Sequence, residues 1–178
     1  MSYSVHFFGI DAQQLTDKFG ASHQPLVELV AQRIRQARRF SKKDVLSTVS
    51  KVAAICEARL PADCDAEYFH ALCWLAEVVG EKIAIPSFVA FRHIHFLNDT
   101  GVWQWLSRSE APFSLPRCED PPPTVGYINT DDMEQWAVPG LIQLPAADIP
   151  ESRYARQEFL EVLESLVEDK LDLLAVLL

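Results

Sequence analysis

The first residues of the chain alternate between apolar and polar side chains, which is the pattern of a β-strand with one buried face. Tyr3, Val5 and Phe7 are separated by polar residues, and aromatic and β-branched side chains favour the extended conformation. We therefore predict a strand over residues 3–10, with Val5 and Phe7 facing the core.

From residue 11 to residue 97 the apolar residues recur every three or four positions, as on one face of an α-helix. Capping and breaking residues divide this part of the chain, with Pro61 ending the third helix and Gly80 the fourth. The predicted helices cover residues 11–19, 23–39, 42–59, 65–80 and 88–97, followed by a helical turn over 102–107.

The character of the chain changes at Ala111, where five prolines between Pro112 and Pro123 predict an extended connection. A short strand is predicted over 124–128. A helix capped by Thr130 and ended by Pro139-Gly140 should follow, and then a last helix over 151–169.

The apolar run over 171–178 fits either a continuation of that helix or a buried strand. We favour the strand because the other two predicted strands need a partner. The prediction is an α+β fold, mostly helical, with a small two- to three-stranded sheet. With 178 residues, 49% of them apolar, one domain over 1–178 is sufficient.

Charge is distributed unevenly along a chain whose formal net charge is -9. This acidity argues against nucleic-acid binding, because phosphates repel an acidic surface. Residues 131–172 hold eleven acids against three bases, whereas residues 33–43 hold a basic run without an acid. This run binds an anionic partner, which is a protein or a small ligand, or it faces the protein's own acidic region. A third alternative is a solvated helix end, where the basic side chains complement the helix dipole. The residues that we predict to bind are Arg35, Arg38, Arg39, Lys42 and Lys43.

A second candidate site lies on the predicted helix over 65–80. His70, Cys73 and Glu77 are three or four residues apart and therefore share one face. A thiol beside an imidazole can act as a nucleophile, but a cysteine that borders an apolar stripe is commonly a small core residue. These three residues are the basis of an alternative hypothesis, that the protein is a small enzyme.

Recognisable catalytic and cofactor motifs are absent from the sequence. The six glycines are scattered, so no phosphate-cradling loop or dinucleotide fingerprint can form. There is no Gly-x-Ser-x-Gly elbow and no His-Glu-x-x-His motif, and no metal or cofactor is expected. Our leading hypothesis is a non-enzymatic binding or protein-interaction module, and acidic immunity proteins that neutralise a basic partner provide an analogy.

Two stretches, Pro112-Phe-Ser-Leu-Pro116 and Asp120-Pro-Pro-Pro-Thr-Val-Gly-Tyr-Ile128, resemble a family of uncharacterised bacterial cytosolic proteins described only as a domain of unknown function. The opening Met1-Ser-Tyr-Ser-Val-His-Phe and the helix-ending Gly80 add to the resemblance. It implies a short apolar strand at the end of the chain. It implies no activity, cofactor or catalytic residue.

Cysteine usage and the first ten residues bear on localisation. Cys56, Cys64, Cys73 and Cys118 do not have the spacing of a zinc or thioredoxin-like motif, and residues 1–10 lack the features of a secretory signal. No apolar run is long enough to span a membrane. We therefore expect a cytoplasmic protein with reduced thiols.

Titration of the denatured protein without reductant should find four thiols, because reduced cysteines stay unpaired in the cytoplasm. The measurement is the absorbance released by an aromatic disulfide reagent. A count of two or none would contradict the cytoplasmic assignment.

Overall fold

The computed structural model describes residues 4–13, 23–37, 42–83, 96–97, 100–107, 109–119, 123–144 and 150–178. A four-stranded antiparallel sheet in the order β2-β1-β4-β3 lies at its centre. The strands are β1 (Val5–Ile10), β2 (Gly80–Ile83), β3 (Thr124–Ile128) and β4 (Asp172–Leu177). The predicted α+β class and its three predicted strands are confirmed, and β2 is a fourth strand.

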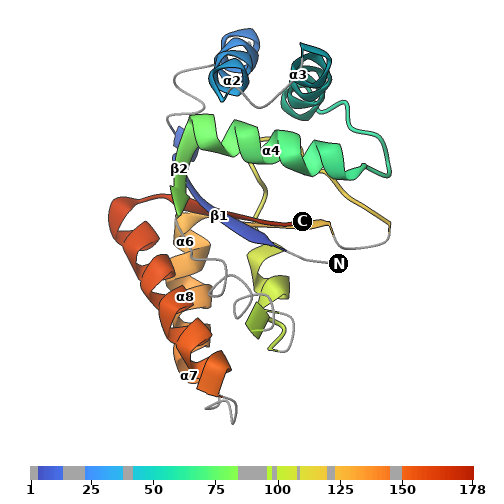
Figure 1. Cartoon of the computed structure of the whole chain (residues 1–178). Coiled ribbons are helices and arrows are strands. Elements are labelled where there is room, and N and C mark those ends of the chain that lie inside the picture. The colour runs from blue at the N-terminus through green and yellow to red at the C-terminus, as the bar shows by residue number, and fades with distance from the viewer. Residues whose placement is uncertain are drawn as a thin grey trace.

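Helices cover both faces of the sheet (Figure 1). On one face α4 (Ala66–Val79) lies against the strands, and α2 (Gln24–Gln36) and α3 (Lys42–Cys56) stack on α4. On the other face lie α8 (Pro150–Asp169), the 3-10 helix η1 (Val102–Ser107) and a continuous helical segment. That segment consists of α6 (Thr130–Asp132), the π-helical turn η2 (Met133–Ala137) and α7 (Val138–Gln143).

The pleat of β1 supplies apolar side chains to two separate cores. Phe8 and Ile10 pack with α2, α3 and α4, whereas Val5 and Phe7 pack with α8 and its neighbours. The Phe7 ring lies 5.4 Å from the ring of Phe159 on α8. The prediction that Val5 and Phe7 face a core is confirmed, and β1 is central in the sheet.

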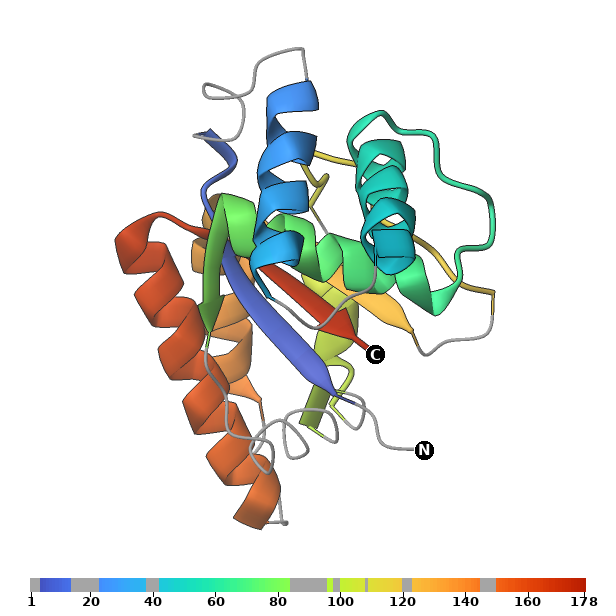
Figure 2. The ribbon, with the colours of Figure 1, turned by 45° about the horizontal axis from the view of Figure 1, so that its top comes forward.

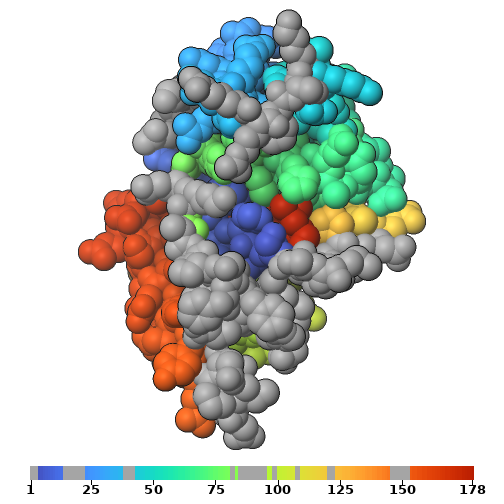
Figure 3. All heavy atoms as spheres, viewed as in Figure 1, coloured from blue at the N-terminus to red at the C-terminus, as the bar shows by residue number. Residues whose placement is uncertain are grey.

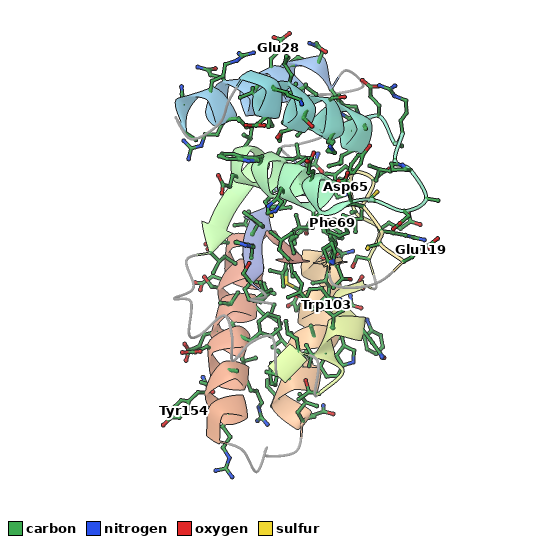
Figure 4. All side chains as sticks on the ribbon, turned by 45° about the vertical axis from the view of Figure 1, so that its right-hand side comes forward. Glu28, Asp65, Phe69, Trp103, Glu119 and Tyr154 are labelled. Carbon is green, nitrogen blue, oxygen red and sulfur yellow. The ribbon has the colours of Figure 1, made fainter. Side chains whose placement is uncertain are left out.

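The start of α4 follows the capping chemistry expected from the sequence. Asp65 is the N-cap, and its carboxylate accepts a hydrogen bond of 2.9 Å from the Glu67 backbone N–H. One turn later the fully buried Phe69 projects from α4 into the layer above the sheet (Figure 4).

The chain leaves α8 through a Schellman motif, which explains why 172–177 is a strand and not more helix. Lys170 adopts a left-handed conformation with φ of 56°, and the Leu171 N–H donates to the Leu166 carbonyl at 2.8 Å. The preference for a strand over a longer helix is therefore confirmed.

A similar motif ends α3 at Cys56, before the predicted end at Arg59. Ala58 has φ of 53°, and the Arg59 N–H donates to the Ala54 carbonyl at 2.8 Å. Neither left-handed residue is a glycine, so the usual signal for a helix end is missing at both places.

Strand β2 begins directly at Gly80, which the sequence analysis identified only as a helix end. The backbone there is extended, and a Cβ atom on Gly80 would lie 2.1 Å from the Gly9 carbonyl oxygen. Gly80 is therefore required for the close approach of two backbones, which lets the chain pass from α4 straight into pairing with β1.

The helix predicted to end at Pro139-Gly140 continues through both residues to Gln143. The π-helical turn just before Pro139 widens the helix, and proline is tolerated in the first turn of the α-helical segment that follows. The N-cap is Asn129, not Thr130; its side chain accepts from the Asp132 N–H at 2.7 Å.

Asp172 is a buried acid, 8% exposed, that links β4 to β3 and α6. Its carboxylate accepts hydrogen bonds from the Tyr127 hydroxyl at 2.6 Å, the Thr130 N–H at 2.9 Å and the Thr130 hydroxyl at 3.0 Å. Burial, and then this carboxylate, raise the pKa of Tyr127, so its phenol stays protonated as the donor.

Two predicted helices, over 11–19 and 88–97, lie almost entirely outside the described residues. Only residues 11–13 and 96–97 of them are described, and of these residues 12–13 and 96–97 are helical. Among the helices that the structure describes, none combines the length and the apolar composition needed to cross a bilayer.

Replacing Phe7 with alanine should lower the free energy of unfolding by about 3–5 kcal/mol, because it leaves a cavity beneath the central strand. Leu46→Ala, at a side chain that is 69% exposed, is the control and should stay within about 0.5 kcal/mol. Equal denaturation midpoints for the two variants would contradict the central position of β1.

Tyr127→Phe should destabilise the protein by about 1–3 kcal/mol, because it removes one donor from a buried carboxylate. Tyr154→Phe makes the same chemical change at a side chain that is 63% exposed and should be neutral. Chemical denaturation measures both, and a neutral Tyr127→Phe would show that the hydrogen bond to Asp172 is dispensable.

Candidate functional site

The predicted basic site lies where α2 ends and α3 begins. Arg35, in the last turn of α2, and Lys43, in the first turn of α3, are both exposed. Lys42 is the first residue of α3, but its side chain lies outside the described residues, as do Arg38 and Arg39 altogether. The structure therefore brings Arg35 and Lys43 to adjoining helix ends and says nothing of the other three side chains.

Arg33 belongs to the same surface and is also exposed. Arg33, Arg35 and Lys43 form no ion pair with any residue in the described part of the chain. Lys51, further along α3, differs because its ammonium group pairs with Glu67 of α4. That pairing raises the pKa of Lys51 and lowers the pKa of Glu67.

The acidic helix α8 lies on the opposite side of the sheet from α2 and α3, as Figures 1 and 2 both show. Its exposed acids include Glu161, Glu164 and Glu168. Both the sheet and α4 separate these carboxylates from Arg35 and Lys43. The two described cations therefore do not face the acids of α8, which argues against the sequence-based alternative in which the basic run faces the protein's own acidic region.

His70, Cys73 and Glu77 lie along one stripe of α4 and line a single hollow of about 460 Å³. His70 is exposed, while Cys73 and Glu77 are half-buried. The prediction that the three share a face is confirmed. The hollow is completed by Ser4, His6, Trp74 and Leu178.

His6 reaches this hollow from β1, far from α4 in the sequence. The Ser4 Oγ lies 3.1 Å from the His6 Nε2, and the Ser4 backbone exchanges hydrogen bonds of 3.0 and 2.9 Å with Leu178. In Figure 3 the β1 end (blue) and the last residues of β4 (red) reach the surface beneath α4 (green). The sequence analysis missed His6, although alternation places it on the same strand face as Phe8, which packs with α4.

These side chains do not form a metal site as they stand. Within the described ranges, no group of three or more histidine, cysteine, aspartate or glutamate residues is placed to hold an ion. The arrangement instead offers a thiol with two imidazoles and a carboxylate around one accessible space.

A larger hollow of about 680 Å³ lies under the proline-rich connection. Glu110, Arg117, Cys118 and Tyr127 are among its lining residues. The connection is tied to the loop that precedes α4 by a hydrogen bond of 2.7 Å from the Cys64 N–H to the Arg117 carbonyl. A second bond, of 3.0 Å, runs from the Glu119 N–H to Asp63; Figure 4 shows Glu119 at this outer edge.

The four cysteines, none of them in a disulfide, fall into two pairs with different surroundings. Cys56 and Cys64 are buried; burial raises the pKa of Cys56 to about 11 and is the main cause that raises the pKa of Cys64. Cys73 and Cys118 are half-buried, and each lines one of the two hollows.

The chain belongs to a family described as a domain of unknown function, DUF7691, whose family model matches residues 1–175. This confirms the resemblance to an uncharacterised domain family, while the bacterial and cytosolic parts of that resemblance stay predictions. Searches of curated proteins and of solved structures gave no match.

Proposed function

We propose that this protein is a non-enzymatic interaction module that binds an acidic protein through the adjoining ends of α2 and α3. We call this surface the basic end; it consists of Arg33, Arg35 and Lys43, with Arg38, Arg39 and Lys42 beside them in the sequence. The observation that carries the proposal is that its described cations are exposed, unpaired by described residues and on the other side of the sheet from α8.

Helix stabilisation explains only part of the basic end. Arg33 and Arg35 lie in the last turn of α2, where positive charge complements the helix dipole. Lys42 and Lys43 lie in the first turn of α3, where the same dipole disfavours positive charge. Selection for helix stability therefore does not account for the lysines, whereas contact with an acidic partner does.

Exposed leucines beside the cations favour a protein partner. Leu29, 41% exposed, lies one turn before Arg33, and Leu46, 69% exposed, lies one turn after Lys43. An aliphatic side chain next to Arg33 and another next to Lys43 fit a protein surface that carries acidic and apolar groups together. A nucleic-acid backbone offers mainly charged phosphates as contacts, and the net charge of -9 repels it.

The acidic face of α8 would be the binding surface in an immunity-like role. Glu161, Glu164 and Glu168 are spaced as the solvated face of an amphipathic helix, which accounts for them without a partner. We therefore place the interaction at the basic end.

Charge reversal tests the proposal. A triple variant with Arg33→Glu, Arg35→Glu and Lys43→Glu should lose at least about tenfold in affinity for a bound acidic protein at low salt, since each exposed pair contributes about 0.2–1 kcal/mol and reversal adds repulsion. The difference should shrink as salt rises, because the Debye length falls. Immobilised wild-type and variant proteins are compared for what they retain from nuclease-treated native lysate, followed by titration of the retained protein.

The matched control reverses three exposed arginines elsewhere, with Arg59→Glu, Arg117→Glu and Arg153→Glu. It changes the net charge by the same amount and should retain the partner. The proposal is overturned if the two triple variants bind alike, or if binding disappears when nucleic acid is digested.

A further inference from the structure

We propose that Cys73 is a site of thiol–disulfide exchange with a low-molecular-weight disulfide, which binds in the hollow between α4 and the ends of β1 and β4. This activity is separate from partner binding, because the basic end lies on α2 and α3, above α4 (Figure 1). The hollow, at about 460 Å³, falls within the range of about 300–1,000 Å³ typical of small-molecule sites.

The groups around Cys73 supply what exchange requires. The thiolate is the nucleophile, so a nearby base must take the thiol proton. His70 lies one helical turn before Cys73, and His6 faces the same space from β1. An imidazole near neutral pH can accept that proton and then, as a cation, stabilise the thiolate.

Glu77 lies one turn after Cys73 and is the one acidic side chain among the described lining residues. Its carboxylate can accept a hydrogen bond from an imidazole and so orient the ring in the hollow. Exchange does not require a strongly depressed thiol pKa, because such a depression also weakens the nucleophile.

The other three cysteines lack this combination. Cys56 and Cys64 are buried, and the pKa of each thiol is raised. Cys118 is half-buried and lines a hollow as Cys73 does, but its charged neighbours there are Glu110 and Arg117. A guanidinium can stabilise a thiolate but cannot accept its proton, so Cys118 is a matched control for the imidazoles.

The step conserves atoms and electrons. The Cys73 thiolate attacks one sulfur of the small disulfide RSSR, a Cys73–SR bond forms, and the original S–S bond breaks. The released RS⁻ takes up the proton held by the imidazole and leaves as RSH. Cys73 is oxidised, and one half of RSSR is reduced. A small thiol reverses the reaction.

The test uses the full chain, with oxidised glutathione as the probe at neutral pH. Samples are quenched with acid, and the adducts are assigned by peptide mass. Cys73 should be modified at least about threefold faster than Cys118, since an imidazole can take the thiol proton whereas a guanidinium cannot. Cys56 and Cys64 should stay unmodified, which shows that the fold is intact in the same sample.

His70→Asn and His6→Asn should each slow modification of Cys73 and leave the rate at Cys118 unchanged. Cys73→Ser should abolish the fast adduct, and Cys118→Ser should keep it. The inference is overturned if Cys118 reacts as fast as Cys73, or if the double histidine variant keeps the wild-type rate at Cys73.

Discussion

The pairing of β1 with β4 is the contact on which the rest of the structure depends. It joins residues near the two ends of the sequence, in a register from Val5 opposite Leu177 to Ile10 opposite Asp172. Each of these strands also carries one outer strand, β2 on β1 and β3 on β4. Without the central pair only two separate two-stranded pairs would remain, and isolated pairs of this kind are marginal in water.

Because both faces of this sheet are covered, the fold separates two sets of helices that differ in charge. The pleat of β1 and β4 sends alternate side chains to opposite cores, so the α2–α4 layer and the α8 layer are anchored to the same two strands. The layer that carries Arg35 and Lys43 therefore stays apart from the layer that carries Glu164. This separation follows from the sheet and needs no specific contact between the charges.

The sequence predicted well what depends on local pattern and poorly what depends on close approach in space. Alternation and apolar runs located β1, β3 and β4, and the Asp65 cap located the start of α4. Strand β2 was missed because its position follows from the contact of Gly80 with Gly9. The turn at Lys170 carries no local signal either, since its left-handed residue is not a glycine.

The hollow at Cys73 shows the same division between local pattern and three-dimensional contact. Helical spacing placed His70, Cys73 and Glu77 on one face, but no sequence rule pairs that face with His6. The contact of Gly80 with Gly9 is a common reference point for the two residues, because α4 and β1 both run toward it before they end. Cys73 lies about 10 Å before Gly80 at 1.5 Å per helical residue, and His6 lies about 10 Å before Gly9 at 3.3 Å per strand residue. The different rises per residue of a helix and a strand therefore bring Cys73 and His6 to the same level. The glycine contact that creates β2 thus also places both residues at one hollow.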